Sequence, residues 1–380
     1  MYDATNIRGT VLDILEDTLA DLDSYQRSLD NIHFDGTMLR IGDYKWNLSQ
    51  KNNVFLICGG KAANATAMAL EHILGPRLTG GVVIIKALEA TDHFEKCEVF
   101  VGGHPLPNIE GYRGCRRILE MVEKLTPDDL VISAISGGTS SLMSCPKEGL
   151  TIEEEMLTSD VLLKSGANIH EINSIRRHIS QINGGNLAKR IEEKGTEMIL
   201  LMHYDAIAPM PTDGKWIPSK ITGGPMASDI TTFRDAKKTI NNYGLENKLP
   251  RNVVNFIFKS PDKDETPKLL KRYTAFLVNT LPDLCLSAQK QARRRGIDAY
   301  ILTSSMDGSS KMAGTFLSEI IKEIRNYGRP FKAPCILIAS GEVDHCAIYG
   351  SLVMDIHSGD HRSYNFIYII HSLENTESAI

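Results

Sequence analysis

One stretch decides how the rest of the chain is interpreted: Asp129-Leu130-Val131-Ile132-Ser133-Ala134-Ile135-Ser136-Gly137-Gly138-Thr139-Ser140-Ser141-Leu142. A short run of β-branched and apolar residues breaks into two glycines and three hydroxyl residues, which is typical of a buried strand, a tight turn and a helix start. Glycines let backbone N–H groups approach an anion closely, and hydroxyl groups add further donors. The turn therefore suits an anion, although a simple reversal of the chain predicts the same residues about equally well.

Length and composition indicate the class of protein. The 380 residues are enough for two domains, each with its own core. The hydrophobic fraction of 42% and the charged fraction of 23% are those of an ordinary soluble globular protein. A net charge of −5 argues against nucleic-acid binding, which needs a basic surface. Seven scattered cysteines without a Cys-x-x-Cys pair indicate reduced thiols and a cytoplasmic location. Neither a signal peptide nor a membrane-spanning apolar run is visible, so no membrane partner is expected.

A second glycine-rich turn lies earlier in the chain. Val54-Phe55-Leu56-Ile57-Cys58 predicts a buried strand, and Gly59-Gly60-Lys61-Ala62-Ala63 predicts a turn that leads into a helix. The spacing differs from the dinucleotide-binding pattern G-x-G-x-x-G, because the later glycine positions hold Lys61 and Asn64. A cation at a helix N-terminus is mildly unfavourable. We therefore expect Lys61 to reach a phosphate rather than to be a solvated surface lysine.

The order of the predicted elements indicates the fold. Further strands are expected at residues 82–86 and 99–101, and a helix at 110–124 leads into the opening strand. This alternation predicts an α/β fold with a doubly wound, mostly parallel, Rossmann-like sheet, whose ligand crevice lies beyond the carboxyl ends of the strands. Both glycine-rich turns would meet there. His104, at the tip of the loop 102–107, either binds substrate or metal or only hydrogen-bonds within its own loop.

The most distinctive helical segment covers residues 164–179. Asn168 followed by Glu171 predicts a capping box at its start, and Gly184-Gly185 predicts its end. Isoleucines at helical spacing form one apolar stripe. The other face carries Asn173, Arg176, Arg177 and Ser180. Such a face is usually solvated, but two arginines and an asparagine also suit an anion.

The C-terminal part predicts a second, smaller α/β domain. A polar, lysine-rich stretch at 259–271 is the expected boundary between a first domain at 1–258 and a second at 273–380. The first helix, residues 7–22, is expected to pack against the first domain. The elements expected beyond the boundary are strands at 273–279, 299–303 and 335–339 and helices at 283–295 and 311–327.

Taken together, these motifs resemble the glycerate 2-kinase family, in which an N-terminal glycerate-kinase domain precedes a C-terminal MOFRL domain and some members are labelled hydroxypyruvate reductase. Their order and spacing agree over about the first 240 residues, which is more specific than any single turn. The resembling stretches are Gly59-Gly60-Lys61-Ala62-Ala63, Gly103-His104-Pro105-Leu106-Pro107, Ser136-Gly137-Gly138-Thr139-Ser140, and Ser165-Gly166-Ala167 through Arg176-Arg177-His178 to Gly184-Gly185.

The resemblance implies transfer of the γ-phosphoryl group of ATP, with Mg²⁺, to the 2-hydroxyl of D-glycerate or a similar small hydroxy acid in a cleft between two lobes. It makes Lys61 the catalytic lysine, which would neutralise charge on the transferring group. It leaves the metal ligands unknown and a homodimer as one option. The residues implied to hold nucleotide phosphate or substrate carboxylate are Gly59, Gly60, His104, Ser136, Gly137, Gly138, Thr139, Ser140, Asn173, Arg176 and Arg177.

The sequence departs from the family pattern in its second half. The family's Ser-Asp pair after a strand is replaced by His203-Tyr204-Asp205, so the catalytic acidic role is carried to Asp205. Ser340-Gly341-Glu342 matches a Ser-Gly-Gly-Glu-Thr turn with one glycine missing, which makes Glu342 a binding candidate. Arg362 matches the catalytic arginine of a Gly-Arg-Asn-Gln-Glu-Phe pattern. The family's Asp-Gly-rich closing segment is absent, so the MOFRL-like domain is expected to be diverged or truncated.

Two other functions stay open at this point. An NAD(P)H-dependent hydroxypyruvate reductase is disfavoured, because no dinucleotide fingerprint with an acidic ribose partner is present. A diverged family member that binds nucleotide or a sugar acid without turnover is the second alternative, motivated by the missing closing segment. Formation of a phosphorylated product would exclude it.

Overall fold

The computed structural model describes residues 7–204, 224–261, 264–344, 353–355 and 364–372. The chain divides into two compact units, which we name after their largest sheets. The six-stranded unit comprises Ser28–His203 and Pro209–Val278, and the four-stranded unit comprises Met1–Arg27, Tyr204–Ala208 and Asn279–Ile380.

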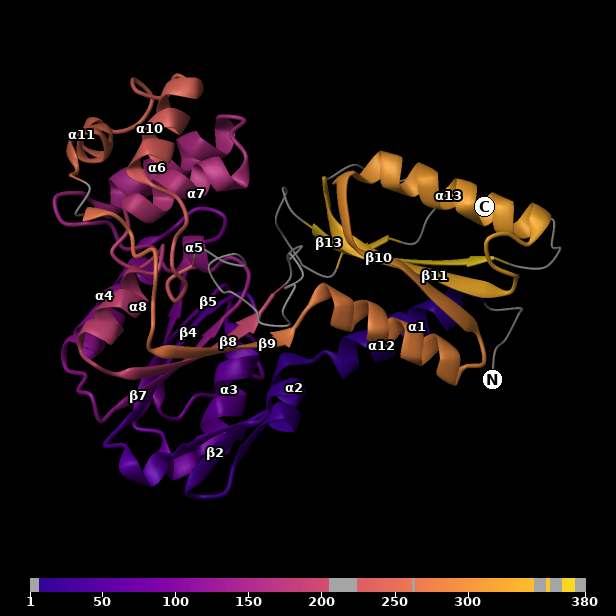
Figure 1. Ribbon diagram of the computed structural model, residues 1–380, viewed down its shortest axis with the longest axis horizontal. Helices are drawn as coiled ribbons and strands as arrows, with labels where there is room; N and C mark the ends of the chain where they lie inside the picture. Colours follow the sequence, from indigo (N-terminus) through magenta and orange to yellow (C-terminus); the bar gives the residue numbers. More distant parts are fainter. Residues whose placement is uncertain (1–6, 205–223, 262–263, 345–352, 356–363, 373–380) are drawn as a thin grey trace. The chain divides into compact units, whose positions relative to one another are not determined.

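The six-stranded unit contains the predicted Rossmann-like sheet (Figure 1). Its strand order is β6-β5-β4-β7-β8-β9, and the ladders from β6 to β8 are parallel. The central strands are almost entirely buried, as continuous apolar runs in a parallel sheet require. The strands are β4 (Val54–Gly60), β5 (Gly80–Ile85), β6 (Cys97–Val101), β7 (Leu130–Ile135), β8 (Glu197–His203) and β9 (Tyr273–Asn279).

The direction of winding reverses between β4 and β7. From β4 the chain passes through α3 (Ala63–Leu74) to β5, whereas α4 (Ile109–Glu123) leads from β6 back to β7 on the other side of β4. Right-handed crossovers then put α3 on one face of the sheet and α4, with α8 (Asn186–Glu193), on the other, as Figure 1 shows. In such sheets, ligands bind at the carboxyl ends of the two strands where the order reverses.

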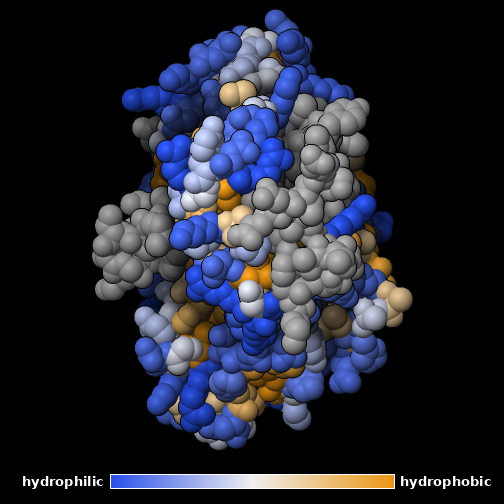
Figure 2. All heavy atoms as spheres, turned by 90° about the vertical axis from the view of Figure 1, so that its right-hand side faces the viewer, coloured by the Kyte–Doolittle hydropathy of each residue, from blue (hydrophilic) through white to orange (hydrophobic). Residues whose placement is uncertain are grey.

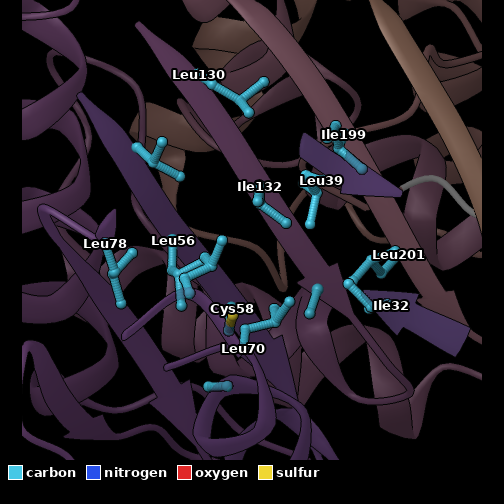
Figure 3. Close-up of a cluster of buried hydrophobic side chains, with 14 of the residues drawn as sticks. Ile32, Leu39, Leu56, Cys58, Leu70, Leu78, Leu130, Ile132, Ile199 and Leu201 are labelled. Atoms are coloured by element: carbon cyan, nitrogen blue, oxygen red, sulfur yellow. The ribbon is translucent and has the colours of Figure 1, made fainter. Parts of the chain in front are cut away.

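A buried core joins the face of the sheet that carries α3 to a small antiparallel sheet (Figure 3). Leu56, Ile132 and Ile199 from three neighbouring strands lie in this core with Leu70 of α3 and Leu39 of the small sheet. In the small sheet, β2 and β3 form a hairpin around Gly42-Asp43. The strands of the small sheet are β1 (Ile32–Phe34), β2 (Met38–Ile41) and β3 (Tyr44–Asn47), and short helical elements nearby in the chain are α2 (Ser24–Asn31), η1 (Leu48–Gln50) and η2 (Gly75–Arg77).

A group of helices lies beyond the short helix α5 (Thr139–Leu142) in Figure 1 and shares a core of its own. The predicted capping box of α7 is present, because Asn168 Oδ1 accepts from Glu171 N–H at 3.1 Å and Glu171 Oε2 accepts from Asn168 N–H at 3.0 Å. The predicted end is wrong, since α7 stops at His178 and Gly185 instead precedes α8. The helices of this group are α6 (Ile152–Lys164), α7 (Ile169–His178), α10 (Phe233–Asn242) and α11 (Arg251–Lys259).

The four-stranded unit contains the N-terminal helix. Ile14 and Leu15 of this helix are buried in one core with Leu284 and Ala288, so the expectation that it packs against the first domain is wrong. The sheet order is β10-β11-β13-β12, with β10 and β11 parallel and the other neighbours antiparallel. The elements are α1 (Ile7–Asp21), α12 (Leu281–Arg294), β10 (Asp298–Ser309), α13 (Ser310–Tyr327), β11 (Cys335–Asp344), β12 (Val353–Asp355) and β13 (Tyr364–Ser372).

Two elements of the C-terminal part differ from expectation. Strand β9 was assigned to the second domain from its sequence, but it is the edge strand of the six-stranded sheet. Strand β9 pairs parallel to β8. The pairing is shown by hydrogen bonds from Met198 N–H to Arg272 O and from Tyr204 N–H to Asn279 O. At 340–342, where a turn was expected, β11 continues as a strand. A Cβ at Gly341 would lie 2.0 Å from Met306 O, so the glycine permits the close approach of β10.

The surface drawn in Figure 2 is mainly hydrophilic, with hydrophobic residues in small separate patches. No helix in the described part of the chain combines the length and apolar character needed to cross a bilayer.

Candidate functional site

The two predicted glycine-rich turns meet at the point where the winding of the sheet reverses. Lys61 N–H donates to Gly137 O at 2.9 Å, and Ser136 N–H donates to Gly59 O at 3.0 Å. Ser136 Oγ also accepts from Ala62 N–H at 3.0 Å. These bonds cross between the ends of β4 and β7, so the turns form one rigid structure, as the sequence predicted.

Two glycines make this close packing possible. Gly60 has a φ of 128°, and a Cβ there would lie 2.1 Å from Ser136 Oγ. Gly138 has a φ of 86°, and a Cβ there would lie 2.9 Å from His104 Cδ2 and 3.4 Å from Lys61 Cγ. Side chains are disfavoured at such φ values. His104 and Lys61 therefore flank the bare backbone of Gly138.

The Ser136 turn presents a row of backbone donors. Within the described ranges, the N–H groups of Gly137, Gly138, Thr139 and Ser140 donate to no protein acceptor. The hydroxyl of half-buried Ser140 also has no protein partner there, whereas Thr139 Oγ1 is used to hold the turn through Gly59 O at 2.9 Å. Successive N–H groups around a glycine turn form a concavity that binds anions. We refer to these four N–H groups as the anion cradle.

Lys61 supplies the positive charge next to the anion cradle. Its side chain is half-buried, and its ammonium group makes neither an ion pair nor a hydrogen bond with any residue that the structure describes. Helix α3 begins two residues later, and its N-cap Ala62 provides no side-chain cap. The uncapped N–H groups and the helix dipole favour negative charge at this position. Lys61 and the start of α3 thus reinforce the cradle.

Two side chains that the sequence analysis did not single out support this region. Ser141 Oγ donates to Gly103 O at 3.0 Å and to Pro105 O at 2.7 Å, which holds the His104 loop against the turn. Asn183 Nδ2 donates to Ser140 O at 3.3 Å and to Met143 O at 2.9 Å. The third hydroxyl of the glycine turn was a usable signal for Ser141, but Asn183 lies too far along the chain for any local pattern.

Two further polar pairs lie near the carboxyl ends of β5 and β8. Asn64, in the first turn of α3, donates to both oxygens of Asp92 at 3.2 Å, in the loop that follows β5. Thr66 Oγ1 lies 2.8 Å from His203 Nε2, at the end of β8. These pairs tie α3 to both halves of the sheet and fix the start of α3, which follows Lys61 in the chain.

The two arginines of α7 have partners within the helical group. Arg176 is 8% exposed, and its Nε donates to Ser159 Oγ at 3.3 Å. Arg177 Nη1 lies 2.9 Å from Oδ1 of the fully buried Asp229 side chain. This face of α7 is therefore not the solvated face that such a stripe usually indicates. None of these contacts reaches the anion cradle, so ligand binding by Arg176 and Arg177 stays a prediction.

Glu155 of α6 is a buried carboxyl group that interacts electrostatically with Arg176. Burial raises the pKa of Glu155 to about 8, and Ser144 and Arg176 only partly oppose this effect. The same burial lowers the pKa of Arg176. In the described part of the chain, Glu155 is hydrogen-bonded to Ser144, whose Oγ donates to Ser141 O at 3.1 Å, and neither Glu155 nor Arg176 contacts the cradle N–H groups directly.

The remaining predicted residues are not brought to the cradle by any described contact. Asp205 and Arg362 lie outside the described residues, as does the side chain of Glu342, whose backbone belongs to β11. Asn173 is half-buried on α7 without a recorded contact. No group of three or more His, Cys, Asp or Glu side chains that could hold a metal ion occurs in the described part of the chain.

Comparison with known proteins identifies the family. A family model described as a domain of unknown function, DUF4147, matches residues 10–258. A glycerate 2-kinase of Pyrococcus horikoshii is 34% identical over 342 residues, which cover 89% of this chain and 74% of that relative. The chain belongs to the glycerate 2-kinase family. This confirms the resemblance found in the sequence motifs.

Other comparisons agree with membership of this family. The crystal structure of a glycerate kinase from Thermotoga maritima matches with a TM-score of 0.73 and 30% identity, over 91% of this chain and 77% of that one. It confirms the α/β fold. A relative from Agrobacterium vitis that is named putative hydroxypyruvate reductase is 30% identical over 76% of this chain and 62% of its own length. The reductase label thus occurs among the relatives, as expected.

Proposed function

We propose that this member of the glycerate 2-kinase family transfers the γ-phosphoryl group of ATP to the 2-hydroxyl of D-glycerate or a similar small hydroxy acid, giving 2-phosphoglycerate from D-glycerate. The observation that carries the proposal is the anion cradle beside the ammonium group of Lys61, which has no partner among the residues that the structure describes. Four backbone N–H donors, the Lys61 side chain and the start of α3 lie together at the ends of β4 and β7, which suits a phosphate group. Relatives named glycerate 2-kinase and glycerate kinase support the reaction class.

The site residues perform two tasks in this reaction. Phosphoryl transfer depends on positioning and on stabilising charge, because the protein makes few covalent changes itself. The cradle holds phosphate oxygens, and Lys61 neutralises the charge that develops on the transferring group. The 2-hydroxyl oxygen bonds to the γ-phosphorus while the bond to ADP breaks. We assign the acceptance of the hydroxyl proton to Asp205, and ligand contacts to His104, Glu342 and Arg362.

The proposal also includes Mg²⁺, which would neutralise part of the phosphate charge when bound with the nucleotide. The phosphate-binding part of the site fits a nucleotide, but we assign no protein ligand to the metal, since the described residues offer no metal-binding cluster. We further propose that the six-stranded unit carries the family's glycerate-kinase domain, that the four-stranded unit, with α1, carries its MOFRL-like domain, and that the protein is cytoplasmic. Six described cysteines are free, which suits that location.

A nicotinamide-dependent reduction receives less support from the β4–α3 turn. The position where the dinucleotide pattern has its last glycine holds Asn64, whose side chain is engaged with Asp92. A glycine at that position would allow close packing of helix on strand beneath a pyrophosphate. The turn therefore suits a phosphate group that is bound next to Lys61 better than it suits a dinucleotide pyrophosphate.

The test is the substitution Lys61→Ala. We expect D-glycerate-dependent formation of ADP to fall by about a hundredfold to a thousandfold, because a preorganised charge at the transferring group is lost. Lys45→Ala, at an exposed lysine of β3, is the matched control and should keep full activity. Phosphorus NMR of the product identifies the phosphorylated oxygen.

Three results would contradict the proposal. Full turnover by Lys61→Ala would remove Lys61 from the mechanism. Binding of ATP by calorimetry without any phosphorylated product would favour a non-catalytic binder. Oxidation of NADH on addition of hydroxypyruvate would favour the reductase.

A further inference from the structure

The anion cradle is tied from behind to a segment that follows α7. Lys147 N–H donates to Ile179 O at 2.8 Å, and Gln181 N–H donates to Cys145 O at 2.7 Å. Pro146 and Ser180 form an antiparallel bridge between these bonds. The chain after the cradle therefore runs beside the chain after α7 like a short two-stranded ribbon.

Asn183 extends this ribbon to the cradle itself. Its side chain is 1% exposed, and its Nδ2 donates to Ser140 O at 3.3 Å and to Met143 O at 2.9 Å. Both acceptors are carbonyl oxygens, so only the NH₂ end of the amide can face them. The backbone N–H of Asn183 donates to Ser180 Oγ at 3.0 Å, which fixes where the side chain starts.

These contacts matter because the cradle has little stability of its own. It leads into α5, a helix of four residues, and a single helical turn does not persist without tertiary contacts. The last carbonyl groups of any helix also lack partners within it. Asn183 supplies partners to two carbonyl groups in and just after α5, on the far side from the free N–H groups of the cradle.

We infer that Asn183 is a positioning residue for the phosphoryl transfer proposed above, and the inference rests on that function. By holding Ser140 O and Met143 O, its amide keeps the N–H groups of the anion cradle aimed at one point. Among the described residues, the Asn183 amide contacts the backbone of Ser140 and Met143 and not Lys61, so we assign its effect to the geometry of the cradle. A phosphate oxygen displaced from its place loses stabilisation mainly in the transition state.

Asn186 provides a matched control in the same segment. Its Nδ2 donates to two carbonyl oxygens, Ser180 O and Asn183 O, both at 2.8 Å. It is 8% exposed, and it therefore resembles Asn183 in chemistry and burial. Asn186 makes no recorded contact with the cradle or α5. A loss of fold stability should follow substitution at either asparagine, whereas a loss of catalysis should follow only at Asn183.

The experiment compares Asn183→Asp with Asn186→Asp. Each change replaces the NH₂ donor by a carboxylate oxygen of the same size that repels the two carbonyl groups. For Asn183→Asp we expect kcat to fall about a hundredfold while the KM for D-glycerate changes about threefold or less, as a misplaced catalytic geometry predicts. For Asn186→Asp we expect kcat to stay within about twofold of the unmodified protein. Unfolding midpoints show whether the two variants lose similar stability.

Equal losses of kcat in the two variants, or an unchanged kcat in Asn183→Asp, would overturn the inference. If Asn183→Asp does not fold, the same comparison is made between Asn183→Ala and Asn186→Ala, which remove the donor without adding charge. If the unmodified protein does not phosphorylate D-glycerate, the proposed function fails. Calorimetry with ATP then tests the inference by itself, since weaker binding confined to Asn183→Asp supports it and equal binding overturns it.

Discussion

Glu155 is a buried carboxyl group whose proton is coupled to folding. Burial raises its pKa to about 8, against 4.5 for the unperturbed group. Between these two pH values the folded protein keeps a proton that the unfolded chain has lost. The free energy of unfolding therefore falls as pH rises through this window, by about 1.4 kcal/mol per pH unit, and the contribution is complete below pH 4.5.

The substitution Glu155→Gln tests this assignment. The amide needs no proton, so we expect the fall in unfolding free energy between pH 5.5 and 7.5 to become shallower by about 1 kcal/mol per pH unit. Urea unfolding at the two pH values measures it. Glu153→Gln, an exposed neighbour on α6, should leave the slope unchanged. Equal slopes for the Glu155 variant and the unmodified protein would contradict the assignment.

At the scale of residues, the sequence allowed Lys61 and the glycine turn to be predicted, but not their supports. A cation at the N-terminus of a helix is electrostatically unfavourable, so the presence of Lys61 there indicates a ligand. Arg176 carries no such signal. Its position on α7 fits a ligand site and a buried contact equally well, and its hydrogen bond to Ser159 depends on the packing of α6, which no local pattern predicts.

The two turns at the ends of β4 and β7 interlock through backbone, which makes Gly60 the most sensitive position of this element. A Cβ at Gly60 would meet Ser136 O at 2.8 Å and Ser136 Oγ at 2.1 Å. Gly149 has a similar need for positive φ, at 87°, yet no described atom lies within 4 Å of a Cβ there. Comparing alanine substitutions at Gly149 and Gly60 therefore separates the effect of backbone strain from the effect of steric collision.

We therefore expect Gly149→Ala to lower the free energy of unfolding by about 1–2 kcal/mol, the cost of an alanine at positive φ. Gly60→Ala should cost more than this and should also abolish D-glycerate-dependent ADP formation, because the Ser136 backbone must move. Chemical unfolding and the ADP assay measure the two effects. An active Gly60→Ala protein would show that the interlock is not needed.

At the scale of elements, periodicity and caps were enough to predict most helices and strands of the six-stranded unit. The box at Asn168 fixed the start of α7, and the box at Thr151 was an unused signal for α6. The sheet to which a strand belongs is a different matter. The sequence of β9 is compatible with either sheet, because the choice of pairing partner depends on residues far along the chain.

At the scale of the molecule, two separate cores predict where a core substitution acts. Ile14 is fully buried in the core of the four-stranded unit, with Leu284 and Ala288. Ile14→Ala should cost about 2–5 kcal/mol of unfolding free energy in that unit. Hydrogen exchange should accelerate in α12 and β10, while β4 and β7 keep their protection.

Leu12, on the same helix, is 39% exposed and serves as the control. Leu12→Ala should change the unfolding free energy by about 0.5 kcal/mol or less. Loss of protection in β4 after Ile14→Ala would contradict the assignment of α1 to the four-stranded unit. The apolar stripe of α1 predicted that a partner exists, but a stripe cannot name the partner.

The composition of the four-stranded unit has a consequence for biosynthesis. Helix α1 is translated before every strand of the six-stranded sheet, whereas α12, which completes its core, is translated after them. Domains usually fold as units while the chain emerges from the ribosome. During elongation the apolar side chains of α1 thus stay exposed to water until the rest of the four-stranded unit has been synthesised. This nascent helix is the segment where chaperone capture and premature aggregation would first compete with folding.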